Sequence, residues 1–249
     1  MSKGLLIVTG GSRGIGAATA VRAATDGWDV AVNYANDEAA AERVVSKVRS
    51  TGQKSIRLRG DINEEADILR LFDKAERELG PVRGLVTSAG TTGLGTRVEN
   101  MTVDAMREVM GLNVIGLMIC CREAVRRMSI KNGGEGGRIV NVASAASRLG
   151  GPNEFVHYAA SKGAVDSFTL GLGREVANEG ILVNAVSPGM IDTEIHAAAG
   201  LPDRASQAIP NIPIRRVGQP EEVAEAIVWL LGDGASYCAG AIIDVTGGR

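Results

Sequence analysis

Aromatic residues are scarce in this sequence, and neither sign of charge dominates it. Among 249 residues there are 2 Trp, 3 Tyr and 3 Phe, and 27 Lys and Arg stand against 29 Asp and Glu. A near-neutral chain has no electrostatic basis for gripping nucleic acid, so no nucleic-acid partner is expected. No apolar run reaches the roughly 18 residues of a membrane span, so no membrane partner is expected either.

Cysteine is also rare, and its placement argues against two kinds of site. The three cysteines are Cys120, Cys121 and Cys238, an odd number without a CxxC pair. That pattern suits neither a disulfide framework nor a set of zinc ligands, and it is typical of buried thiols in a reducing compartment. We therefore predict a cytoplasmic protein without a metal site.

Proline is sparse too, whereas glycine is abundant. The 7 prolines are too few for a proline-rich disordered chain, and the 33 glycines show no Gly-X-Y period. Hydrophobic residues make up 45% of the chain, as in ordinary globular proteins. No linker or change of composition divides the sequence, so we predict one domain over residues 1–249.

Short β-branched runs alternate with longer segments of helical period. Strands are predicted at residues 5–8, 30–32, 56–58, 85–86, 139–142, 182–186 and 242–245. Helices are predicted at residues 15–25, 37–49, 68–79, 103–128, 157–176 and 221–231. Strands separated by helices form βαβ units, in which the strands run parallel and helices cover both faces. The predicted fold class is therefore α/β, with a doubly wound parallel sheet.

A glycine-rich loop follows the first predicted strand and leads into a helix. Its glycines at Gly10, Gly14 and Gly16 would let a pyrophosphate approach the backbone N–H groups at the helix N-terminus, although their spacing differs from GxGxxG. The same residues also fit G-x-S-x-G, the nucleophile elbow of α/β-hydrolases, with Ser12 as nucleophile. Only His157 and His196 could serve such a hydrolase, so we keep it as the less favoured alternative.

The end of the second predicted strand bears on the choice of dinucleotide. NAD sites usually place a carboxylate there to bind the ribose 2′-hydroxyl, but this chain has Asn33 and Tyr34. Asp37 lies near the expected distance, yet its position before an alanine-rich helix predicts an N-cap. Arg13 projects from the glycine loop and would attract a 2′-phosphate. NADP is therefore the preferred cofactor, with NAD as the alternative.

Tyr158 and Lys162 are four residues apart, which places them on one face of a helix. An ammonium beside a phenol should lower the phenol pKa from about 10 toward neutral and so produce an acid/base group. Ser144 follows a strand and could hold a substrate oxygen. Asn113 interrupts an apolar helical run, where a buried amide needs partners. Each residue alone has an ordinary structural explanation, but together they follow a nucleotide loop.

These residues resemble the pattern of the short-chain dehydrogenase/reductase family. The likeness rests on Thr9-Gly10-x-x-x-Gly14-x-Gly16, Asn113, Ser144 and Tyr158-x-x-x-Lys162, and it extends nearly to the C-terminus. It implies a Rossmann-type fold with seven parallel strands and hydride transfer between nicotinamide and a carbonyl or secondary alcohol. It also implies that the tyrosine is the general acid/base, the serine binds the substrate oxygen, the lysine tunes the tyrosine and binds ribose, and the asparagine holds a relay water.

The resemblance also assigns a set of cofactor-binding residues and an assembly. The set comprises Gly10, Ser12, Arg13, Gly14, Ile15, Gly16, Asn33, Tyr34, Asp61, Ile62, Ser88, Ala89, Gly90, Tyr158, Lys162, Pro188, Gly189, Ile191 and Thr193. The family suggests a homotetramer with the long helices near Asn113 and Tyr158 at one interface. One departure is Thr87-Ser88-Ala89-Gly90, where the family usually has Asn-Asn-Ala-Gly, so two bracing amides are missing.

The segment from His196 to Val217 is irregular and contains three prolines. In a doubly wound domain it follows the sixth strand, where ligands bind, so we predict a substrate lid over about residues 190–217. Its small apolar residues do not identify the small-molecule substrate, which could be of the 3-oxoacyl or the sugar and alcohol type. A non-catalytic dinucleotide sensor on the same fold is the alternative function.

Overall fold

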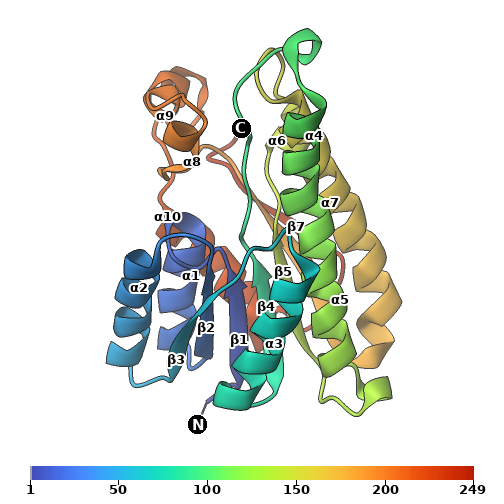
Figure 1. Ribbon diagram of the computed structural model, residues 1–249. Helices are drawn as coiled ribbons and strands as arrows, with labels where there is room; N and C mark the ends of the chain where they lie inside the picture. Colours follow the sequence, from blue (N-terminus) through green and yellow to red (C-terminus); the bar gives the residue numbers. More distant parts are fainter. Residues whose placement is uncertain (1) are drawn as a thin grey trace.

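The computed structural model describes residues 2–249 and contains one sheet of seven parallel strands (Figure 1). The strands are β1 Leu5–Thr9, β2 Asp29–Tyr34, β3 Ser55–Arg59, β4 Val82–Thr87, β5 Gly137–Val142, β6 Ile181–Pro188 and β7 Ile242–Val245. Their order is β3-β2-β1-β4-β5-β6-β7, which is the doubly wound order of the Rossmann fold. The predicted fold class is confirmed, and each predicted strand is present.

Helices cover both faces of the sheet, and each face has its own core. One layer contains α1 Gly14–Thr25, α2 Glu38–Ser50 and α10 Pro220–Leu231. The other contains α3 Glu65–Leu79, α5 Leu117–Met128 and α7 Val156–Val176. Strand β1, which is apolar from Leu5 to Val8, lies between them, with Leu6 and Val8 facing the first layer and Leu5 and Ile7 the second. Burial on both faces explains why the strand has no polar alternation.

The sheet has its topological switch point between β1 and β4. Strand β1 pairs in parallel with β2 on one side and with β4 on the other, so the chain winds in opposite directions from it. Loops leaving the carboxyl ends of these two strands diverge and open a crevice, which is where doubly wound folds bind ligands. The glycine loop leaves β1 at this point.

The helix predicted over residues 103–128 is not one regular α-helix. It consists of α4 Val103–Met110, a π-helical segment Gly111–Gly116 and α5, which continue one another in a single column (Figure 1). A β-carbon at Gly116 would collide with the carbonyl oxygen of Ile62, so the backbone passes close to the β3–α3 connection here. Periodicity alone does not reveal the wider turn, which is frequent at functional sites.

The lid segment is more ordered than its sequence suggests. It contains two short helices, α8 Ile195–Ala198 and α9 Arg204–Ala208, which rise beyond the carboxyl edge of the sheet (Figure 1). Met190, Ala208 and Ile212 form a small core of its own. Within residues 2–249, no helix has the length and apolar character needed to cross a membrane.

Candidate active site

Tyr158 and Lys162 lie one turn apart near the start of α7, as their spacing predicts. The Lys162 side chain is buried, and its Nζ donates a hydrogen bond to the carbonyl oxygen of Val142, 2.7 Å away. The same nitrogen lies 5.8 Å from the centroid of the Tyr158 ring. The lysine therefore joins α7 to the end of β5 while keeping its charge beside the phenol.

Burial dominates the protonation of both side chains. It lowers the pKa of Lys162 to about 8, although the nearby carboxylate of Asp166 opposes the change. Burial also raises the pKa of Tyr158, and a hydrogen bond with Ser144 partly offsets this rise. The predicted fall of the phenol pKa toward neutral is therefore not found, because desolvation of Tyr158 raises its pKa instead. Tyr158 is a protonated donor at neutral pH.

Ser144 lies in the turn between β5 and the short helix α6 Ala146–Leu149. Its hydroxyl oxygen accepts a hydrogen bond from the backbone N–H of Ala146 at 3.1 Å, and its carbonyl oxygen accepts one from Ser147 Oγ at 2.9 Å. These bonds fix the turn and do not use the hydroxyl proton, which is directed at Tyr158. Ser144 can therefore donate to an oxygen placed beside Tyr158.

Asn113 lies in the π-helical segment, and its amide is fully engaged. Its Oδ1 accepts from the N–H of Thr91 at 2.9 Å, and its Nδ2 donates to the Thr91 carbonyl at 2.8 Å and to Ser161 Oγ at 3.0 Å. Ser161 in turn donates to the carbonyl oxygen of Tyr158 at 2.7 Å. The asparagine thus connects the loop after β4 to α7. Its buried position was predictable from sequence, but its partners were not.

The glycine loop forms a cradle at the N-terminus of α1. No side chain caps this helix, so its first-turn N–H groups remain free for an anion. Gly14 has φ +52°, and a β-carbon at Gly16 would collide with the carbonyl oxygen of Gly10. An uncapped helix N-terminus behind a loop with three glycines, Gly10, Gly11 and Gly14, fits the pyrophosphate of a dinucleotide. Ile15 lies within this first turn, and Thr193 packs against Gly14 from the other side.

Asn33 and Tyr34 do not present their side chains to a ligand. The Asn33 amide is buried, accepts from the N–H of Gly10 at 3.2 Å and donates to the carbonyl oxygen of Gly60 at 3.0 Å. The Tyr34 ring is buried in the core beneath α1 and α2. The Asn33 amide instead holds Gly10 of the glycine loop in place from behind.

Asp61 and Ile62 also differ from each other in exposure. Asp61 lines a hollow together with Arg59, and its Oδ1 accepts from the N–H of Asn63 at 2.9 Å. Ile62 is buried in the core under the π-helical segment. Only Asp61 thus offers a side chain at the surface where the adenine is expected.

A basic hollow of about 420 Å³ opens beside the glycine loop. Its lining includes Ser12, three cations (Arg13, Arg43 and Lys47) and two acids (Asp37 and Glu194). Asp37 accepts from the N–H of Ala40 at 2.8 Å, which confirms the predicted N-cap of α2. No histidine lines the hollow, so a hydrolase base for Ser12 is missing from it.

The loop after β4 is held by side-chain contacts that the sequence did not predict. Thr9 Oγ1 accepts from the N–H groups of Ser88 at 3.1 Å and Ala89 at 3.2 Å. Thr87 Oγ1 donates to Asn141 Oδ1 at 2.8 Å from the neighbouring strand. The Asn141 amide on β5 therefore accepts the hydroxyl proton of Thr87. At position 87 the family usually has an asparagine in place of this threonine. The sequence did carry a signal for these contacts, because polar residues inside otherwise apolar strands need hydrogen-bond partners.

Gly90, Pro188, Gly189 and Ile191 complete the surroundings of the site. A β-carbon at Gly90 would lie 3.1 Å from Asn113 Oδ1 and 3.9 Å from Lys162 Nζ, so this loop touches the Tyr–Lys pair. The Pro188 carbonyl accepts from the N–H of Ala145 at 2.9 Å, next to Ser144, and Gly189 donates to Val245 at 2.9 Å. Ile191 is buried at the base of the lid.

Comparison with known proteins agrees with this geometry. The family profile that matches residues 10–249 is described as "Enoyl-(Acyl carrier protein) reductase". An oxidoreductase of Escherichia coli (strain K12), "Uncharacterized oxidoreductase YgfF", is 50% identical over 98% of this chain and 99% of its own length. The chain belongs to the short-chain dehydrogenase/reductase family.

Two further members of this family show its range. The 3-oxoacyl-(acyl-carrier-protein) reductase of Synechocystis sp. is 35% identical over 97% of this chain and 95% of its own length. A blue fluorescent protein from a metagenomic library, solved in complex with NADPH, has a TM-score of 0.90 at 31% identity, covering 99% of this chain and 98% of that one. The chain is therefore an oxidoreductase of a nicotinamide-dependent family.

Proposed function

We propose that this protein is an NADP-preferring oxidoreductase that interconverts a carbonyl and a CH–OH group, with Tyr158 as general acid/base. The proposal rests on one observation: four side chains converge beside the glycine loop and the uncapped N-terminus of α1. They are Ser144, Tyr158, Lys162 and Asn113. A phenol that stays protonated at neutral pH is suited to donate its proton to a carbonyl oxygen.

Each side chain then has a separate task in the reduction. The Ser144 hydroxyl holds the substrate oxygen within reach of the Tyr158 phenol. Lys162 binds the nicotinamide ribose, and its ammonium stabilises the phenolate that remains after proton transfer. Asn113 fixes the loop after β4 and the start of α7 relative to each other. The bound dinucleotide supplies the hydride.

The cofactor preference is supported by charge. Arg13, Arg43 and Lys47 line one hollow, and within residues 2–249 none of the three has an ion-pair partner. The 2′-phosphate of NADP is a strong anion that would find these three cations there, and they outnumber the two carboxylates of the hollow, Glu194 and the N-cap Asp37. The solved relative in complex with NADPH agrees with this assignment.

The proposal is tested by following NADPH oxidation at 340 nm over a panel of carbonyl substrates, including 3-oxoacyl thioesters, with sugars and secondary alcohols in the reverse direction. Tyr158→Phe should lower kcat by about 10²- to 10⁴-fold while NADPH still binds. Unchanged turnover in this variant would refute the proposed chemistry. NADPH binding without turnover of any substrate by the wild-type protein would favour the dinucleotide sensor.

A homotetramer is proposed on the basis of two separate apolar faces. One consists of Val103, Met106 and Met110 on α4 with Ile115 beyond it, and the other of Trp229, Tyr237 and Ile242 at the β7 edge. Two different self-complementary contacts generate a closed tetramer with dihedral symmetry. The Met110→Glu and Trp229→Glu variants should each be dimers when their mass is measured by light scattering. If both variants are monomers, or both remain tetramers, this arrangement is contradicted.

A further inference from the structure

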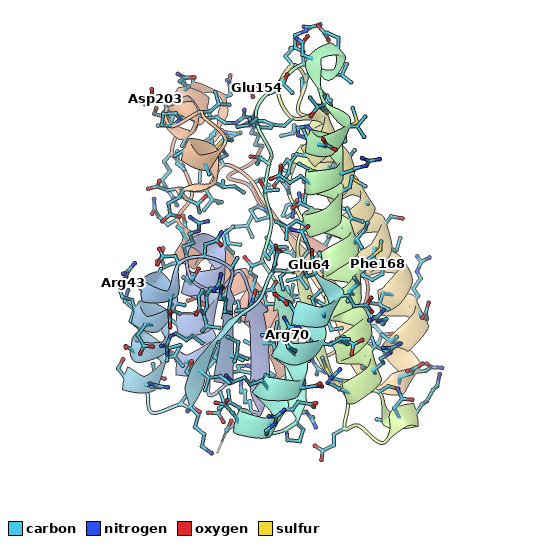
Figure 2. The ribbon with its side chains drawn as sticks, in the orientation of Figure 1. Arg43, Glu64, Arg70, Glu154, Phe168 and Asp203 are labelled. Carbon is cyan, nitrogen blue, oxygen red and sulfur yellow. The ribbon has the colours of Figure 1, made fainter. Side chains whose placement is uncertain are left out.

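The tip of the lid is attached to the segment that leads into α7. Arg204, at the start of α9, forms an ion pair with the carboxylate of Glu154. Its guanidinium carbon also lies 4.5 Å from the centroid of the Phe155 ring, within the range of a cation–π contact. Figure 2 shows Glu154 facing the part of the lid that carries Asp203, the residue before Arg204.

Glu154 and Phe155 are closely connected to the candidate active site. Phe155 is buried and forms the N-cap position of α7, three residues before Tyr158. The carbonyl oxygen of Glu154 accepts from the N–H of Thr96, in the loop after β4, at 2.9 Å. The lid tip therefore contacts the two segments that position Tyr158 and Asn113.

An apolar contact lies beside this ion pair. A β-carbon at Gly95 would lie 3.3 Å from Leu201 Cδ1 and 3.5 Å from Phe155 Cζ. Leu201 belongs to the lid, Gly95 to the loop after β4 and Phe155 to the start of α7. Three segments distant in sequence thus meet around Phe155.

The base of the lid has the features of a hinge. The N–H of Asp192 donates to the carbonyl oxygen of Gly218, and the N–H of Gly218 donates to that of Met190, both at 2.9 Å. These bonds close a long excursion at its two ends, while Met190, Ala208 and Ile212 give it a separate core. The C-terminal part of the lid is also held at Ile214, whose N–H donates to the carbonyl oxygen of Gly247 at 3.2 Å, so the part that can move once the tip is released is residues 195–208.

We propose that Arg204 is the latch of this lid: its contacts with Glu154 and Phe155 hold residues 195–208 closed over Tyr158. This deepens the proposed function, because it assumes that substrate binds beneath the lid. Arg204 is a positioning residue that acts through the lid and the start of α7. Burial and the nearby cation Arg249 lower the pKa of its guanidinium, and Glu154 and the Phe155 ring are the groups that contact the cation favourably.

The first test needs no turnover. Hydrogen exchange of the full-length protein, with and without NADPH, should show about tenfold faster exchange in residues 195–208 for Arg204→Gln and for Glu154→Gln. Arg57→Gln is the matched control, because Arg57 pairs with Glu38 and Glu42, which are not part of the lid. Unchanged exchange in both latch variants, with Arg57→Gln the same, would overturn the latch.

The second test separates the latch from the proposed chemistry. With any carbonyl that the wild-type protein reduces, Arg204→Gln should raise KM about tenfold while kcat changes by less than about threefold. Arg204→Lys keeps the charge but loses the planar stack on Phe155, so its KM should lie between that of the wild-type protein and that of Arg204→Gln. Wild-type protein without turnover would refute the proposed function and leave the exchange result standing. If kcat falls equally in Arg204→Gln and Arg204→Lys while KM and hydrogen exchange stay unchanged, the latch is refuted and the proposed function is not.

Discussion

The ammonium of Lys162 donates a hydrogen bond to the carbonyl oxygen of Val142, the last residue of β5, at 2.7 Å. Ser144 lies only two residues further on, so this single bond fixes α7 relative to the turn that carries the serine. It also leaves the charge of Lys162 in a buried position beside Tyr158. The position of the lysine and its protonation are therefore separate contributions to the site, and each can be tested.

Reductive turnover should fall as the pH rises through about 8. Burial lowers the pKa of Lys162 to about 8, so the ammonium is present below this pH and is lost above it. Without the cation, the phenolate left by proton transfer from Tyr158 is less stable. The pH profile of kcat for NADPH-dependent reduction checks this, with half of the plateau expected near pH 8. A profile that stays level to about pH 9.5 would contradict the role of the lysine charge.

Asp166→Asn should move this alkaline fall to lower pH. Asp166 lies one turn after Lys162, and its carboxylate raises the pKa of the lysine. Arg148 and Asp244, which form an ion pair at 2.6 Å, also face Asp166, and neither changes in the variant. Removing the negative charge lowers the lysine pKa, by about half a pH unit. Asp104→Asn, on the exposed part of α4, serves as control and should leave the profile where it is.

The local features of this site were readable from the sequence, because they depend on neighbours along the chain. Tyr158 and Lys162 share a helix face at i and i+4, and Asp37 precedes an alanine-rich helix, so both placements follow from helix geometry. The doubly wound parallel sheet follows from the alternation of strands and helices, and its seven strands from the resemblance. These inferences need no knowledge of which distant segments meet.

The features that were missed depend on tertiary contacts. Asn33 was expected at the cofactor, but its side chain faces inward because Gly10 and Gly60 both offer backbone groups there. The Tyr158 pKa was expected to fall, yet desolvation depends on burial that the sequence does not state. Arg204 and Glu154 are 50 residues apart and meet only when the lid folds back.

Asn33→Ala should destabilise the protein and weaken cofactor binding together. The substitution leaves the N–H of Gly10 and the carbonyl oxygen of Gly60 without partners in a buried region. A loss of about 2 kcal/mol in the free energy of unfolding is expected, as measured by urea denaturation. NADPH affinity should also fall, because the glycine loop loses its support. Asn132→Ala, an exposed asparagine, should change neither quantity; a neutral Asn33→Ala would show that the loop does not need the amide.

Arg43→Gln should reduce the preference for NADPH over NADH. Arg43 lines the hollow beside Arg13 but has no ion-pair partner within residues 2–249, so its charge is free for a 2′-phosphate. We expect the KM for NADPH to rise about three- to tenfold while that for NADH stays constant. Arg57→Gln is the control, because Arg57 is paired with Glu38 and Glu42 outside the hollow. Equal effects on both cofactors would place the 2′-phosphate elsewhere.

Asn141→Ala should be the most destabilising polar substitution near the loop after β4. Asn141 accepts from Thr87 Oγ1 at 2.8 Å and donates to Thr169 Oγ1 at 2.9 Å, and all three side chains are buried. The variant leaves two hydroxyls unpaired and opens a small cavity, so a loss of about 3 kcal/mol is expected. Urea denaturation of Asn141→Ala, Thr87→Val and the double variant should give a coupling of about 1 kcal/mol.

Thr92→Val is the comparison for this cycle, because Thr92 is a buried threonine of the same loop that does not bond to Asn141. It should combine additively with Asn141→Ala. If Thr87→Val is additive as well, the bond between β4 and β5 contributes nothing specific, and the loop after β4 is held by Thr9 and Asn113 instead. A measured coupling would instead show that Asn141 on β5 braces the end of β4 through Thr87. In the family, an asparagine at position 87 usually provides this bracing.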